Sequence, residues 1–67
     1  MADSITLGPL QYDKLGVLHV GVGRDGFVAV AGDVHTLADG ERHRFERTGV
    51  TVTRRGEAYT FSRDHGD

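Results

Sequence analysis

One glycine-rich segment matches a nucleotide-binding pattern. Residues 21–26, GVGRDG, have the spacing G-x-G-x-x-G of a dinucleotide-binding loop. In that loop the glycines follow a strand and open a helix, because the helix N-terminus holds the pyrophosphate. Here residues 27–31, FVAVA, come next, and they favour a strand. We therefore interpret the segment as a glycine-rich hairpin turn and predict no cofactor.

The histidines are a second source of chemistry. His19, His35, His43 and His65 show neither the i, i+4 spacing of metal ligands on a helix nor alternate spacing on a strand. Asp33 and His35 would share one strand face, and His19 could join them in space. A minor metal-binding or hydrolytic site at His19, Asp33 and His35 is thus an alternative, although we predict no metal. Otherwise His19 is a partly buried polar group with one hydrogen bond, and the other histidines lie on the surface.

Covalent and acid–base catalysis have little support. Ser4 and Ser62 lie near the chain ends in ordinary strand contexts, whereas a nucleophile needs a base and an orienting group. The acidic residues stand mostly beside turn glycines, where aspartate caps the turn. A catalytic carboxylate pair needs at least one buried acid. We predict that the protein is not an enzyme.

A group of arginines is the best candidate for a polar site. Arg42 and Arg44 share one strand face, and Arg54 and Arg55 end the next predicted strand. With Tyr59 they could form a cationic, stacking surface for single-stranded nucleic acid, as in small β-barrels. The formal net charge of −2 and the pI of about 6.0 argue against it. Nucleic acid therefore remains an alternative, beside a solvated face of cross-strand Arg–Glu pairs or a charged protein contact.

The glycine spacing predicts the fold class. Ten glycines in 67 residues leave no glycine-free stretch longer than nine residues, too short for a stable helix. The intervening runs favour strands, and the Asp-Gly pairs at 25–26 and 39–40 favour hairpins. We predict one all-β domain over residues 1–67, with 1–3 and 64–67 frayed. It is a small meander of five to seven short strands, forming a barrel (SH3-like or OB-like in size) or a two-layer sandwich. The predicted strands are Ser4–Leu7, Leu10–Val22 (bent or broken at Gly16), Phe27–Gly32, Val34–Leu37 (alternatively a loop), Glu41–Thr48, Val50–Arg54 and Ala58–Arg63.

The apolar pattern differs between the two halves. In residues 15–22 and 27–31 both strand faces carry apolar side chains, whereas residues 50–53 and 58–62 alternate. In residues 15–22, for example, we expect Leu18, Val20 and Val22 on one face. Either the domain encloses this hairpin itself, or a partner covers its second face. The residues predicted for that interface are Leu15, Val17, His19, Phe27, Val28 and Val30.

Charge is divided in the same way. Residues 1–40 carry two cations against five carboxylates, and residues 41–63 carry six arginines against three glutamates. Such a division can drive head-to-tail or self-complementary contacts. The leading hypothesis is a non-enzymatic domain acting through protein–protein contact, as a homo-oligomer or an accessory or structural subunit of a larger assembly, including a viral one. We find no signal peptide and no apolar run that could form a membrane helix, and predict a cytoplasmic protein or a virion component.

Overall fold

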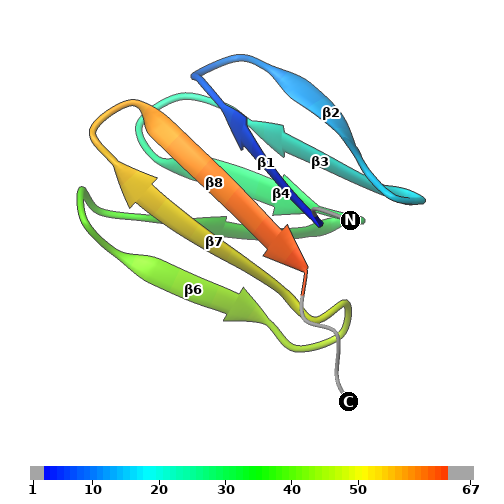
Figure 1. Ribbon diagram of the computed structural model, residues 1–67. Coiled ribbons are helices and arrows are strands. Elements are labelled where there is room, and N and C mark those ends of the chain that lie inside the picture. Colours follow the sequence, from blue (N-terminus) through cyan, green and yellow to red (C-terminus); the bar gives the residue numbers. More distant parts are fainter. Residues whose placement is uncertain (1–2, 64–67) are drawn as a thin grey trace.

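The protein is a two-layer β-sandwich. The computed structural model describes residues 3–63 and contains eight short strands in two antiparallel sheets of four. Sheet I has the order β1-β8-β7-β6 and sheet II the order β2-β3-β4-β5, and Figure 1 shows the two sheets lying one over the other. The strands are β1 Ser4–Leu7, β2 Tyr12–Leu15, β3 Leu18–Val22, β4 Phe27–Val30, β5 Asp33–Thr36, β6 Arg42–Phe45, β7 Val50–Arg55 and β8 Ala58–Arg63.

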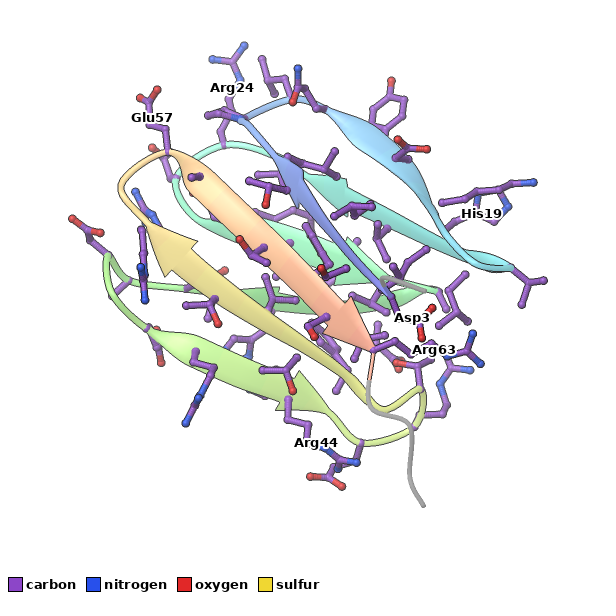
Figure 2. All side chains as sticks on the ribbon, viewed as in Figure 1. Asp3, His19, Arg24, Arg44, Glu57 and Arg63 are labelled. Atoms are coloured by element: carbon purple, nitrogen blue, oxygen red, sulfur yellow. The ribbon has the colours of Figure 1, made fainter. Side chains whose placement is uncertain are left out.

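The all-β prediction is confirmed, and of the two predicted architectures the sandwich is the one formed; it has eight strands where five to seven were predicted. The predicted fraying at residues 1–2 and 64–67 lies outside the described residues. Asp3 is described, and its carbonyl accepts a hydrogen bond from the Arg63 N–H at 2.8 Å. The β1–β8 ladder therefore extends one residue beyond β1, and Figure 2 shows Asp3 and Arg63 at the same end of these strands.

Three tight turns connect the strands of sheet II. Asp25 and Gly26 both have positive φ, 57° and 85°, as a turn between antiparallel strands of this twist requires. Ala31 and Gly32 adopt the same conformation between β4 and β5. The second predicted hairpin pair, Asp39-Gly40, instead lies in the connection from β5 to β6, where the chain crosses from sheet II to sheet I. The expectation of a hairpin there is wrong because the strands on its two sides belong to different layers.

The predicted strand Leu10–Val22 is two strands. Gly16, with a φ of 65°, begins a two-residue turn that places Leu15 opposite Leu18. The turn reverses the chain, so the alternation of side chains does not continue through it. Leu15 consequently faces the core with Val20 and is 4% exposed, not on the face of Val17 as the uninterrupted pattern predicts. The predicted strand Glu41–Thr48 is also shorter, because residues 46–49 form the turn between β6 and β7.

The core lies between the sheets and takes alternate residues from their strands. Val28, Val30, Val50, Val52 and Phe61 are fully buried, which shows that both inner faces are closed. Among the described residues no polar or charged residue is buried. The complete core consists of Leu7, Leu15, Val20, Val22, Val28, Val30, Leu37, Phe45, Val50, Val52, Tyr59 and Phe61.

Candidate protein-contact face

The outer face of sheet II gathers the exposed apolar side chains. Since Val20, Val22, Val28 and Val30 point into the core, their neighbours along β3 and β4 point outward. In the described part of the chain, five large apolar side chains are substantially exposed, and all belong to sheet II, its turns or the loop that leads into it. They are Leu10 (58%), Tyr12 (83%), Val17 (81%), Phe27 (42%) and Val34 (58%).

The strand register places four outward residues in one row across the sheet. Tyr12 pairs with Gly21, Gly21 with Ala29, and Ala29 with Val34. The row therefore has large side chains at its two ends and almost none in its middle. Phe27 lies on the same face, two residues before Ala29 on β4. We call the surface formed by Tyr12, Gly21, Phe27, Ala29 and Val34 the apolar face.

A shallow trough runs along β3 within the apolar face. It has a volume of about 180 Å³. A Cβ on Gly21 would lie 3.2 Å from the Tyr12 Cβ, and one on Gly23 would lie 3.0 Å from the Phe27 ring. The two aromatic side chains thus lean over glycines, as they do where aromatic residues cover exposed backbone in a sheet. The trough is lined by Tyr12, Gly21, Val22, Gly23, Phe27 and Ala29.

The structure divides the predicted interface residues. Val17, His19 and Phe27 are exposed. Leu15, Val28 and Val30 lie in the core, so their predicted place on a contact surface is corrected. The hairpin does have two apolar faces, but sheet I covers the inner one and only the outer one remains open.

Sequence reasoning missed Tyr12 and Val34. Tyr12 stands in the polar run QYDK, and Val34 follows a turn, so neither belongs to an apolar stretch. Only the register shows that both residues end the row through Gly21 and Ala29. The one available signal was the aromatic residue Tyr12 in a short polar segment, and it did not show to which face of the sheet the side chain points.

The outer face of sheet I is polar. Arg42 and Arg44 point outward from β6, as predicted, and pair with Thr53 and Thr51. The rows continue across β7, β8 and β1 through hydroxyl side chains, and the Oγ1 atoms of Thr6 and Thr60 lie 3.1 Å apart. Arg55 ends β7 on the same face, opposite Ala58. The two complete rows are Arg42-Thr53-Thr60-Thr6 and Arg44-Thr51-Ser62-Ser4.

Two residues predicted for a nucleic-acid surface, Arg54 and Tyr59, make contacts within the protein instead. The Arg54 guanidinium donates hydrogen bonds to the carbonyls of Leu37 and Gly56, both at 2.8 Å. Its central carbon lies 5.5 Å from the centre of the Tyr59 ring, and Tyr59 is only 2% exposed. Arg54 and Tyr59 therefore close one end of the sandwich, and Tyr59 does not offer a stacking surface to a base.

The alternative metal or hydrolytic site does not assemble. His19 pairs with Lys14 and is exposed on the outer face of sheet II, not partly buried as predicted. Asp33 and His35 pair with the core residues Val30 and Val28, so they lie on the inner face of the sheet, opposite to His19. Asp33 forms an ion pair of 2.9 Å with Arg47, and His35 stacks on His43. Within residues 3–63 no three metal-ligating side chains are grouped closely enough to hold an ion.

Comparison of the chain with protein-family models, with curated proteins and with solved structures yields no match. No helix within the described residues is long and apolar enough to cross a membrane.

Proposed function

We propose that this protein is a non-catalytic β-sandwich that acts through protein–protein contact, and that its apolar face binds a second copy of the chain. One observation carries the proposal: every substantially exposed large apolar side chain of the described residues belongs to sheet II or its loops, and none to sheet I. A surface of this kind, limited to one side of a small protein, is typical of an interaction site.

The shape and charge of the apolar face fit another sheet. The face is the outer surface of a four-stranded sheet with a shallow trough, and β-sheets readily pack face to face. Lys14 is the only charged residue at the outward strand positions of sheet II, so packing would desolvate little charge.

The size of the face predicts a weak contact. Four strands about 4.8 Å apart, each about 15 Å long, span less than the roughly 800 Å² per partner of a standard interface. We therefore expect a concentration-dependent dimer with a dissociation constant of about 10 µM or weaker. Weak contacts become effective when several act together. This property suits an accessory or structural subunit of a larger assembly, of which a virion is one example.

Sedimentation equilibrium tests the proposal. Over concentrations from about 10 µM to 1 mM the wild-type chain should pass from monomer to dimer. Tyr12→Lys and Val34→Lys place a charge at either end of the row and should weaken the dimer at least about tenfold. Thr53→Lys, on the opposite face, is the matched control and should leave it unchanged. A wild-type chain that stays monomeric, or equal weakening by Thr53→Lys, would overturn the proposal.

Nucleic-acid binding is the second candidate function. It is favoured by the position of Arg42, Arg44 and Arg55 on one polar face, with no acidic residue at the outward strand positions of sheet I. Since Tyr59 is buried, this face would contact phosphates and not stack on bases. Binding of a single-stranded oligonucleotide should then fall steeply with salt. Arg42→Glu combined with Arg55→Glu should abolish it, and no binding at low salt would exclude this function.

A further inference from the structure

Two histidines from different sheets form a parallel stack. His35 in β5 belongs to sheet II and His43 in β6 belongs to sheet I, and both are half-buried. Their ring centres lie 3.7 Å apart, and their planes differ by only 8°. Phe45, which is 4% exposed, packs its ring at 4.8 Å and 87° to His43 and at 6.5 Å and 88° to His35. The stack thus covers one margin of the hydrophobic core.

The stack lies where the two sheets have no backbone ladder between them. β5 and β6 are edge strands of their sheets, joined only by the connection of residues 37–41. Besides the rings, Arg47 also spans this margin: it pairs with Asp33 at 2.9 Å and donates a hydrogen bond to the Ala31 carbonyl. The histidine stack is therefore a principal contact between the sheets at this edge.

The geometry of the stack does not suit a shared metal ion. Parallel imidazole rings direct their nitrogen lone pairs side by side, whereas ligands of one ion must converge on it. The described residues also supply no third ligand here. The contact is therefore best understood as ring stacking, which depends on the charge of the rings.

We propose that the His35–His43 stack is an acid-sensitive latch between the two sheets. Histidine is the side chain that ordinarily changes its charge between pH 5 and 8. With at most one ring protonated, the stack is held by contact between the rings. With both protonated, two positive charges face each other with ring centres 3.7 Å apart, and they repel. The latch then opens and the sheets separate at β5 and β6.

The residues paired with the two histidines in their sheets, Val28 and Val52, carry no charge. The inward neighbours on β4 and β7 are Val28, Val30, Val50 and Val52, which have no charge. On β5 the Asp33 carboxylate is engaged by Arg47, and on β6 Arg42 and Arg44 point to the outer face of sheet I, away from the stack. In the connection between β5 and β6, the carboxylates of Asp39 and Glu41 accept hydrogen bonds from the backbone N–H groups of Gly56 and Ala38.

The sign of the pH effect follows from proton binding. The unfolded chain accepts both protons without this repulsion, so below neutral pH it binds more protons than the native state. Stability therefore rises with pH in this range and falls as the pH is lowered.

Thermal unfolding of the full chain at pH 7.5 and at pH 5.0 tests the latch. Wild type should lose several degrees of melting temperature more than His43→Phe, which keeps an aromatic ring but no charge. His35→Phe should behave like His43→Phe, and His19→Phe on the exposed face should keep the wild-type pH dependence. His43→Gln provides a second neutral variant in case a phenylalanine variant does not fold. Equal pH dependence in wild type and the neutral variants at positions 35 and 43 would overturn the proposal.

Amide hydrogen exchange localises the opening. After correction for the intrinsic pH dependence of exchange, protection of β5 and β6 should fall at pH 5.0 more than protection of β3 and β8. The difference should vanish in His43→Phe. A uniform loss of protection over the sandwich would contradict a latch at this margin, since it would indicate global destabilisation.

Discussion

The outer faces of the two sheets differ although their inner faces are alike. Both sheets contribute valine and aromatic or leucine side chains to one core. Outside, sheet I carries threonine, serine and arginine, whereas sheet II carries Tyr12, Phe27 and Val34 around small residues. Folding requires only the inner faces to be apolar. The apolar residues on the outer face of sheet II therefore call for an explanation beyond folding. The polar outer face of sheet I does not.

The largest expected effect comes from removing part of the shared core. Phe61→Ala should lower the free energy of unfolding by about 3–5 kcal/mol, because the ring is fully buried and leaves a cavity. Its neighbour Ser62 points outward on the same strand, so Ser62→Ala should change stability by less than about 0.5 kcal/mol. Urea unfolding measures both. Similar losses in the two variants would contradict the assignment of inner and outer faces.

A somewhat smaller loss is expected at the end of the sandwich where Arg54 closes it. Gly26 has a φ of 85°, and a Cβ there would collide with the Leu37 carbonyl and lie 2.8 Å from Arg54 Nη1. Gly26→Ala should therefore destabilise the fold by about 2–3 kcal/mol. Gly40→Ala is the matched control: its φ is 83°, but no atom lies near the added Cβ. It should cost about 1 kcal/mol, the conformational part alone.

A substitution that fills the trough distinguishes the role of the apolar face in self-association from its role in stability. Gly21→Ser adds a small side chain beside Tyr12 in the centre of the row, where a Cβ would meet Tyr12 Cβ at 3.2 Å. We expect the free energy of unfolding to fall by about 1 kcal/mol, because the contact is with a Cβ and the backbone of edge strand β2 must shift by a few tenths of an ångström. The dimer should nevertheless weaken measurably in sedimentation experiments. A large loss of stability with unchanged self-association would assign Tyr12 to covering glycine alone.

The smallest effect is expected on the polar face. Arg44 Nη1 lies 2.5 Å from Glu46 Oε1, but the two side chains are 43% and 83% exposed. Solvent and salt screen such a pair, so Glu46→Gln should change the free energy of unfolding by about 0–0.5 kcal/mol. Chemical denaturation at low and high salt measures it. A loss above 1 kcal/mol would mean that the polar face contributes to the fold as the core does.

Local patterns were enough to predict much of this fold. Glycine spacing and β-forming residues predicted an all-β domain, and the limits of Ser4–Leu7 and Ala58–Arg63 agree with β1 and β8. The outward direction of Arg42 and Arg44 also followed from alternation along a single strand. These features depend on neighbours in the chain, whose conformational preferences act over a few residues.

Other features were decided only when distant segments met. The turn at Gly16 reverses the direction of Leu15, and no local signal distinguishes this hairpin from a bend. Tyr12 lies opposite Gly21 only in one register.

His35 and His43 stack because β5 and β6 end up at the same margin of different sheets. The sequence by itself therefore determined which residues form strands, since that depends on local backbone preference. The tertiary structure decided which faces are covered and which side chains meet, because these depend on register and on how the two layers pack.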